Sequence, residues 1–273
     1  MRPLAALILA SSLAAAWPAE VAFKKEGKGP GVVLIHGFGG NRGVWSEQVA
    51  RMKKDHTVLA IDLPGHGDSA APPVKDGAVD LDAVAAEIAA LMRKQKVAPA
   101  VVVGHSTGGS VAVRVALADP AAVKGLVLVD AILAPAEAAR EEAFMKRLDT
   151  EAPQVLGEFF GGLAADEAQK ARALRDALKV SPGTLKAYRA SRISDTVGDR
   201  AAGVSVPVAF FTSSALIPDP AREKEALQRL GLARFPKLTV SYFVNAKHWI
   251  MWDEPDTFDV LYNDYEAGLT AAK

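Results

Sequence analysis

The chain has 273 residues, of which 50% are hydrophobic and 23% are charged. This composition supports one large domain or a core with an inserted cap, and it excludes a disordered protein. The 32 basic side chains are balanced by 32 acidic ones, so no field of one sign would recruit nucleic acid or an anionic membrane. The chain contains no cysteine, which excludes disulfides, a thiol nucleophile and a thiolate metal site.

The first residues have the pattern of a secretory signal peptide. Arg2 supplies a positive charge, residues 4–16 form an unbroken run of apolar and small residues, and small residues follow. Cleavage can fall after Ala16 or Ala19, and Ala16 is favoured because Trp17 would occupy the third position before a cut at Ala19. The alternative is an uncleaved anchor or a first core helix, although the run is short for a membrane span. We expect residues 1–19 to direct export, with no stable membrane insertion after cleavage.

Apolar runs rich in β-branched residues then alternate with helical patterns. The predicted strands cover residues 32–36, 58–62, 100–103, 125–129, 208–211 and 239–244, and helical patterns cover residues 79–96 and 108–118. Strands without polar alternation are typical of a parallel sheet that is covered on both faces. The repetition of strand and helix therefore predicts an α/β fold, with a mostly parallel central sheet and helices on both faces.

One segment interrupts this alternation. Residues 135–204 contain no convincing strand, but charged helical patterns cover residues 136–148 and 166–179. A long helical stretch between two strands indicates a cap over the strand ends. We therefore expect a first part of the core at residues 20–134, a helical cap at 135–204 and a second part of the core at 205–273.

A candidate nucleophile stands between a predicted strand and a predicted helix. Residues 104–108 read Gly-His-Ser-Thr-Gly, which is a G-x-S-x-G motif in the structural context that this motif requires. Such a tight turn holds the serine in strained backbone and exposes its hydroxyl at the carboxyl edge of the sheet. The motif predicts that Ser106 is a nucleophile.

A serine hydroxyl needs a general base, and the chain offers five histidines. His248 follows the last predicted strand, in a loop that can return over the nucleophile. His36, His66 and His105 belong to glycine-rich turns and are interpreted as hydrogen-bonded scaffold, and His56 is expected to be solvated in a polar loop. His248 is therefore the predicted base.

Acyl transfer also needs donors for a developing oxyanion. By position, these are the backbone N–H groups of Thr107, which follows the nucleophile, and of Phe38 in the glycine-rich loop at 36–40. Asp62 and Asp68 could suggest a metal site, but turn formation is the preferred interpretation because they flank Pro-Gly-His-Gly. We expect no metal and no cofactor.

Taken together, the motifs resemble the α/β-hydrolase superfamily of small esterases and related enzymes. The resemblance covers residues 30–130 and 239–260, and it includes the order of Ser106 before His248. It is carried by four segments: His-Gly-Phe-Gly at 36–39, Asp-Leu-Pro-Gly-His-Gly-Asp-Ser at 62–69, Gly-His-Ser-Thr-Gly-Gly at 104–109, and His248 before Asp-Glu-Pro at 253–255. No motif covers the predicted cap.

The acid of the implied Ser-His-Asp triad departs from the usual pattern of this superfamily. The resemblance implies an Asp in the loop after the strand at 208–211, but Leu216 or a neighbour occupies that position. Asp130, which ends the preceding strand, is the favoured replacement, because some members of the superfamily supply the acid from there. Asp219, further along the loop, is the alternative acid. Either carboxylate would hold the imidazole of His248 in the useful tautomer.

The leading functional hypothesis is hydrolysis of a small carboxylic ester, a lactone or a thioester through an acyl-enzyme. A serine nucleophile argues against dehalogenase and epoxide-hydrolase chemistry, which need a carboxylate at this position. The alternatives are a secreted ligand-binding or signalling module with little turnover, and an acyltransferase or perhydrolase. The expected partner is a small-molecule ester.

Overall fold

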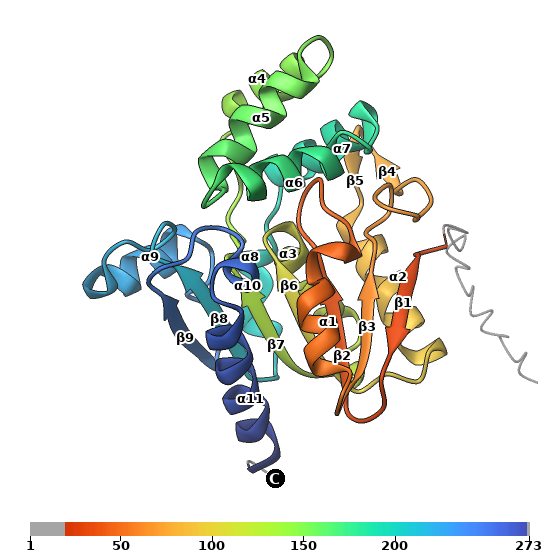
Figure 1. The fold of residues 1–273 in the computed structure, drawn as a ribbon, viewed down its shortest axis with the longest axis vertical. Coiled ribbons are helices and arrows are strands. Elements are labelled where there is room, and N and C mark those ends of the chain that lie inside the picture. The colour runs from red at the N-terminus through yellow and green to blue at the C-terminus, as the bar shows by residue number, and fades with distance from the viewer. Residues whose placement is uncertain (1–19, 272–273) are drawn as a thin grey trace, which may run out of the picture.

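The computed structural model describes residues 20–271, so the predicted signal peptide lies outside the described residues. A seven-stranded sheet in the order β1-β3-β2-β6-β7-β8-β9 forms the centre of the molecule (Figure 1). Its strands are β1 (Phe23–Glu26), β2 (Gly31–Ile35), β3 (Thr57–Ile61), β6 (Ala100–His105), β7 (Val123–Val129), β8 (Val208–Ser213) and β9 (Leu238–Phe243). All neighbouring strands are parallel except β1 and β3. The predicted α/β class with a mostly parallel sheet is confirmed.

The antiparallel edge strand β1 was missed because its sequence, Phe-Lys-Lys-Glu, has no continuous apolar run and its residues are partly or fully exposed. The inner strands β2, β6 and β8 are buried at every position, as the sequence pattern predicted. Strand β2 pairs with β3 on one side and with β6 on the other, so the direction of winding reverses between β2 and β6. In open α/β sheets, this switch point is where ligand sites form, beyond the carboxyl ends of the strands.

Helices cover both faces of the sheet. Figure 1 shows α1 (Ser46–Met52) and α11 (Pro255–Ala271) in front of it and α2 (Leu81–Lys94) and α3 (Thr107–Ala118) behind it. The other elements of the core are the two-stranded sheet of β4 (Val74–Lys75) and β5 (Ala78–Val79), the helices α9 (Glu223–Arg229) and α10 (Ile250–Asp253), and the short 3-10 helices η1 (Arg42–Trp45), η2 (Pro120–Ala122) and η4 (Pro220–Arg222). No helix within residues 20–271 is long and apolar enough to cross a membrane.

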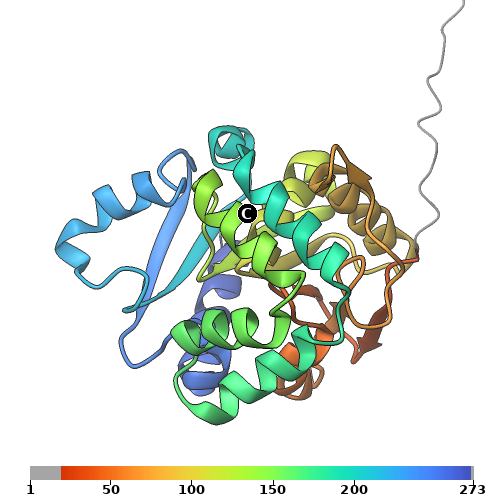
Figure 2. The ribbon, with the colours of Figure 1, turned by 90° about the horizontal axis from the view of Figure 1, so that it is seen from above.

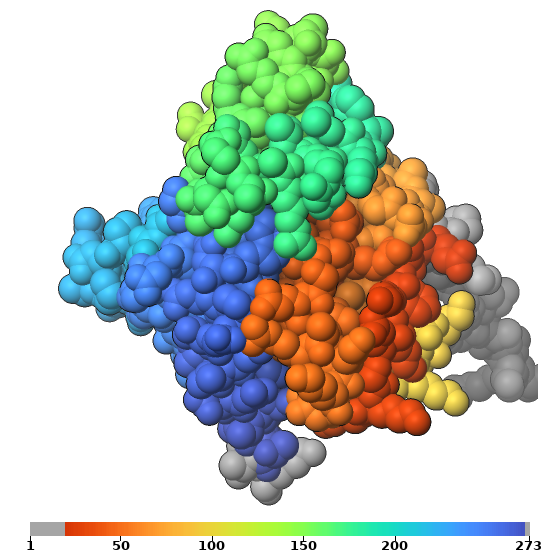
Figure 3. Space-filling model, in the orientation of Figure 1, coloured from red at the N-terminus to blue at the C-terminus, as the bar shows by residue number. Residues whose placement is uncertain are grey.

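Between β7 and β8 the chain is helical. This segment contains α4 (Ala138–Leu148), α5 (Ala152–Leu163), α6 (Glu167–Ala177), α7 (Pro182–Ile193), α8 (Val197–Arg200) and η3 (Ala201–Gly203). Helices α4 to α7 form a layer beyond the carboxyl ends of the strands, which we call the cap (Figures 1 and 2). The space-filling view shows the cap as a continuous cover over the two parts of the core (Figure 3).

The expectation that His56 is solvated is wrong. His56 is only 6% exposed, and it links the loop before β3 to the C-terminal helix α11. Its Nδ1 lies 2.6 Å from a carboxylate oxygen of Asp55 and its Nε2 lies 2.5 Å from one of Glu266. Burial opposes the charged imidazole, but these two carboxylates outweigh burial and raise the pKa of His56. Glu266 lies far away in the sequence, so the local pattern held no sign of this contact.

We expect His56→Gln to lower the free energy of unfolding by about 1–3 kcal/mol at pH 6 and by less at pH 9. The pKa of His56 is higher in the folded chain than its ordinary value of 6.5, so its stabilisation is complete below that value and is lost as the pH rises through the folded pKa. Chemical denaturation of parent and variant at both pH values measures the difference. Lys53→Gln, which breaks an exposed ion pair with Glu26, is the pH-independent control. An equal effect of His56→Gln at both pH values would contradict the assignment.

Candidate active site

Ser106 occupies a strained turn between β6 and α3. Its backbone angles are φ 52° and ψ −119°, in a region that residues other than glycine rarely adopt. A Cβ added at Gly104 would lie 2.3 Å from the carbonyl oxygen of Gly108, and one added at Gly108 would lie 2.5 Å from that of Ile35. Glycine is therefore required at both positions. The turn brings the nucleophile candidate to the switch point of the sheet.

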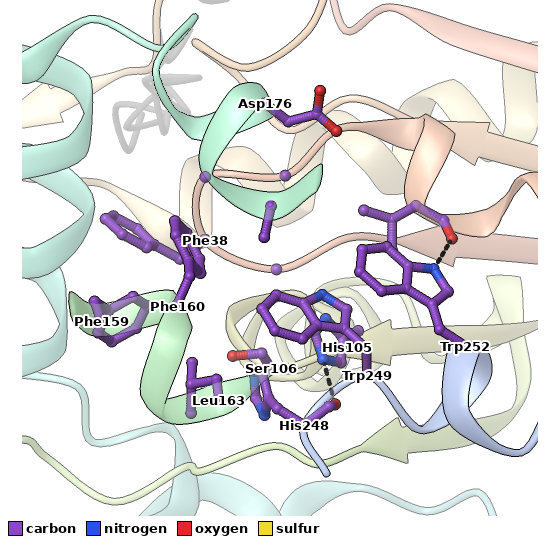
Figure 4. Close-up of a pocket in the computed structure, with 15 residues that line it drawn as sticks. Phe38, His105, Ser106, Phe159, Phe160, Leu163, Asp176, His248, Trp249 and Trp252 are labelled. Carbon is purple, nitrogen blue, oxygen red and sulfur yellow. Dashed lines mark hydrogen bonds between the residues drawn. The ribbon is translucent and has the colours of Figure 1, made fainter. Parts of the chain in front are cut away.

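The structure brings Asp130 and His248 together. His248 lies in the loop between β9 and α10, and its Nδ1 is 2.8 Å from Oδ2 of Asp130. A proton on Nδ1 satisfies this contact and leaves the lone pair of Nε2 free to accept a proton. His248 and Ser106 line the same pocket (Figure 4). The buried carboxylate of Asp130 is thus in contact with the imidazole of His248, and this imidazole lines the same pocket as the candidate nucleophile.

Ser213 holds the carboxylate of Asp130, and the sequence analysis did not identify it. Both the backbone N–H and the hydroxyl of Ser213 donate to Oδ1 of Asp130, each at 2.9 Å. Ser213 is fully buried at the end of β8, and its Oγ also accepts a hydrogen bond from the N–H of Leu216. The end of β8, just before the loop in which the superfamily usually carries the acid, therefore supplies hydrogen bonds to the candidate acid, which follows the neighbouring strand β7. The only signal in the sequence was the serine at the end of that strand.

Asp219, the alternative acid, has a different role. It is exposed, and its carboxylate accepts a hydrogen bond from the N–H of Ala221 at the start of η4.

Asp62 accepts hydrogen bonds from the N–H groups of Arg42 and Asp68 and forms an ion pair with the Arg42 side chain. These contacts shape the loop after β3. Within residues 20–271, no cluster of three potential metal ligands is found.

The loop after β2 lies directly against the nucleophile. A Cβ added at Gly37 would be 3.0 Å from the Cβ of Ser106, so the absence of a side chain permits this approach. The next N–H group along the loop belongs to Phe38. Thr107 is the first residue of α3, and N–H groups in the first turn of a helix have no partner within it. Of the two predicted oxyanion donors, Thr107 thus follows Ser106 directly in the sequence, and Phe38 follows the glycine that packs against Ser106.

Two buried neutral histidines hold this loop. Nδ1 of His36 is 2.8 Å from the carbonyl oxygen of Gly37, and its Nε2 accepts a hydrogen bond from Leu63 N–H. Nε2 of His66 accepts a hydrogen bond from the N–H of Gly39. Burial lowers the pKa of His36 to about 4 and that of His66 to about 3, so both are neutral near pH 7. Because the peptide is planar and trans, fixing the carbonyl of Gly37 also fixes the N–H that follows it.

The loop that carries His248 forms hydrogen bonds with both the core and the cap. His105 donates from Nε2 to the carbonyl oxygen of His248 at 2.9 Å, while burial keeps the pKa of His105 well below its ordinary value. Towards the cap, the N–H of His248 donates to the carbonyl oxygen of Leu163 at the end of α5. Nζ of Lys247 donates to the next carbonyl, that of Ala164. The candidate base therefore contacts both the core and the cap.

The pocket in front of Ser106 has mainly apolar, aromatic walls. Figure 4 shows Asp176 at the end of the pocket opposite Ser106. Trp249 and Trp252 stack with their ring planes 6° apart, and the guanidinium of Arg172 in the cap lies 4.1 Å from the ring centre of Trp252. The apolar residues that line the pocket are Phe38, Val44, Phe159, Phe160, Leu163, Ala173, Trp249 and Trp252. Core and cap both contribute to this wall.

Comparison with known proteins places the chain in a family. The model of the alpha/beta hydrolase family matches residues 32–259. The chain therefore belongs to the alpha/beta hydrolase family, as the motifs indicated. Solved structures share the fold: an esterase from Exiguobacterium antarcticum has a TM-score of 0.78 at 16% identity and covers 90% of this chain and 95% of its own. The enol-lactonase from Burkholderia xenovorans LB400 has a TM-score of 0.78 at 20% identity and covers 91% of this chain and 97% of its own.

Sequence relatives match over shorter segments. The pimeloyl-[acyl-carrier protein] methyl ester esterase of Vibrio parahaemolyticus is 40% identical over 103 residues, which are 38% of this chain and 37% of the relative. The protein with the same name from Aeromonas hydrophila is 34% identical over 152 residues, which are 55% of this chain and 54% of the relative. The chain thus matches about half or less of the length of these relatives.

We expect Asp130→Asn to reduce kcat for an activated ester by about 10⁴-fold, because an amide at this position favours the wrong tautomer of His248. Asp219→Asn removes the other candidate acid, which is exposed, and we expect it to leave kcat within about twofold of the parent. Initial rates of p-nitrophenyl acetate hydrolysis measure both effects. Near-parental activity of Asp130→Asn, with loss of activity in Asp219→Asn, would reverse the assignment of the acid.

Proposed function

We propose that this protein is a serine hydrolase that cleaves small carboxylic esters through an acyl-enzyme. The observation that carries the proposal is the 2.8 Å contact between Asp130 and His248, beside a pocket that also contains Ser106 in its strained turn. Burying an aspartate beside a histidine costs desolvation free energy. Orientation of a general base is a function that accounts for such a pair next to a pocket.

The proposed reaction begins when His248 accepts the proton of Ser106 and Oγ attacks the ester carbonyl. The negative charge then develops on the carbonyl oxygen, where the N–H groups of Phe38 and Thr107 stabilise it. His248 next gives the proton to the leaving alcohol, and the acyl group remains on Ser106. In the second half, His248 activates water, which attacks the acyl-enzyme and releases the carboxylic acid. Asp130 stabilises the imidazolium in both halves.

The pocket disfavours a carboxylate-bearing acyl chain. Its walls are mainly phenyl, indole and aliphatic groups, which cannot replace the water that a charge loses, and the carboxylate of Asp176 at the end opposite Ser106 would repel a second carboxylate. The relatives and structural neighbours, which include a methyl ester esterase and an enol-lactonase, support an ester or lactone substrate. Thioesters use the same machinery, and they belong to the same proposal.

We expect Ser106→Ala to lower kcat for p-nitrophenyl esters by about 10⁴-fold or more while the fold is kept. Ser214→Ala, which changes a serine outside the pocket, is the matched control and should keep parental rates. A series of acyl chains of increasing length would give the highest kcat/KM with apolar chains that fit between the aromatic walls. The parent enzyme and Ser214→Ala should also prefer a neutral acyl chain to a carboxylate-bearing one of equal length. A folded parent protein without turnover above buffer would refute the esterase proposal.

We also propose that the protein is exported by its first 19 residues. The support is the sequence itself: a positive Arg2, the apolar run at 4–16 and the small residues that follow. We expect expression of the full chain in a Gram-negative host to give a periplasmic or secreted product that begins at Trp17 or Glu20, as measured by intact mass. Ile8→Arg, which places a charge in the apolar run, should leave uncleaved protein in the cytoplasm, whereas Ser12→Ala should be exported. Cytoplasmic, full-length parent protein would contradict the proposal.

A further inference from the structure

A buried arginine lies directly behind the wall of the pocket. Arg189 of α7 is only 7% exposed, although arginine is rarely buried without a partner. Its guanidinium carbon lies 5.3 Å from the ring centre of Phe38, 4.6 Å from that of Phe144 and 5.0 Å from that of Phe159. These distances are typical of cation–π contacts. The three rings also pack edge-on against one another, so Arg189 closes an aromatic cage.

Glu141 of α4 fixes the position of this charge. Nη2 of Arg189 donates to Oε1 of Glu141 at 2.9 Å, and its Nε lies 2.5 Å from Oε2. Both side chains are buried, so the pair is screened little by water. Burial lowers the pKa of Arg189 to about 10, but this value still leaves the guanidinium charged at neutral pH. The cage therefore contains a permanent, immobile cation.

Two of the three rings are shared with the active site. Phe38 and Phe159 line the pocket, whereas Arg189 and Glu141 are not among its lining residues. Phe38 is the residue whose N–H is the proposed oxyanion donor. Its side chain therefore points into a cage built from three cap helices, while its backbone lies beside Ser106. A displacement of the cage would move this N–H relative to the reacting carbonyl.

We propose that Arg189 is a positioning residue that holds Phe38 through the cage and thereby aligns the oxyanion-binding N–H group. This inference rests on the proposed esterase function. Arg189 does not touch the substrate. Through Arg189, the cap contributes to stabilisation of the transition state, and it also covers the pocket. Oxyanion donors contribute only when their geometry is preorganised, so a small shift of Phe38 is expected to lower kcat more than it raises KM.

The test uses variants that keep the cap apolar and folded. Arg189→Met alone would leave Glu141 buried without a partner, so the principal variant is the double substitution Arg189→Met and Glu141→Leu, which replaces the pair with apolar side chains of similar size. Arg189→Lys retains a cation but loses the planar fork. The matched control is Lys186→Met with Asp149→Asn, because this exposed ion pair also joins α7 to the end of α4. Circular dichroism and thermal unfolding show that each variant is folded.

We expect the double variant to lose about 10-fold or more in kcat, with KM changed less than about threefold. Arg189→Lys should fall between the parent and the double variant, and the control pair should match the parent. A trifluoromethyl ketone, which forms an oxyanion adduct with the serine, should bind the double variant more weakly by the same factor as the loss in kcat/KM. The methyl ketone of the same chain, which forms little adduct, should bind both proteins equally. If the cage only stabilised the fold, its removal would change the affinities for the two ketones by the same factor.

A double-mutant cycle identifies the route of the effect. In a Phe38→Leu background the backbone N–H remains but the ring is gone, so removal of the Arg189–Glu141 pair should have little further effect on kcat. Additive losses in kcat would overturn the proposal, and so would parental kcat in a folded double variant. An equal loss of affinity for both ketones would also overturn it, because that result indicates a collapsed pocket. If the parent protein itself has no esterase activity, the proposed function fails, and that outcome is distinct from the others.

Discussion

The tight turn between β6 and α3 determines where every other group of the site must lie. Ser106 adopts a positive φ, and a Cβ at Gly104 or Gly108 would overlap backbone atoms. Such strain persists only when the surroundings fix it, and here the Ser106 N–H donates to Val129 O at the end of β7. The same end of β7 carries Asp130. The proposed nucleophile and the proposed acid are thus positioned by one parallel pair of strands, and the proposed base must reach them from a loop beyond β9.

The position of the proposed acid, Asp130, depends on hydrogen bonds from the neighbouring strand. A carboxylate from β7 can replace one from the loop after β8 because both chain segments end at the same edge of the sheet. Asp130 has a positive φ, and its carboxylate lies between Nδ1 of His248 and the two donors of Ser213. A buried carboxylate without these donors would be costly. Ser213 thus stabilises the carboxylate of Asp130 through Oδ1, while Oδ2 faces His248.

The sequence identified candidate groups that are set by local geometry, and it missed contacts that are set by the fold as a whole. Ser106 stood out because its glycines serve one turn, and His248 because few histidines were available. The choice between Asp130 and Asp219 stayed open, since both follow the expected strands and only tertiary structure shows which carboxylate faces the imidazole. His56 was misjudged for the same reason, because its partner Glu266 belongs to the last helix. The cap gave periodic patterns but no pairing, so α4 and α6 were expected while the aromatic cage could not be foreseen.

The groups that hold the loop beside Ser106 differ in charge from the group that packs against the side chain of Phe38, and this difference has a physical basis. In the core, the loop beside Ser106 is held by His36 and His66, which are neutral, so their hydrogen bonds fix the peptide without placing a competing charge near the oxyanion. The cap instead contributes a cation, Arg189, but it is neutralised by Glu141 and separated from the pocket by phenyl rings. A free cation at the same place would bind the carboxylate product and slow its release. Pairing the charge and covering it with aromatic rings keeps the contact of Arg189 with the Phe38 ring, through which we propose that it acts, and removes most of the field of the charge from the pocket.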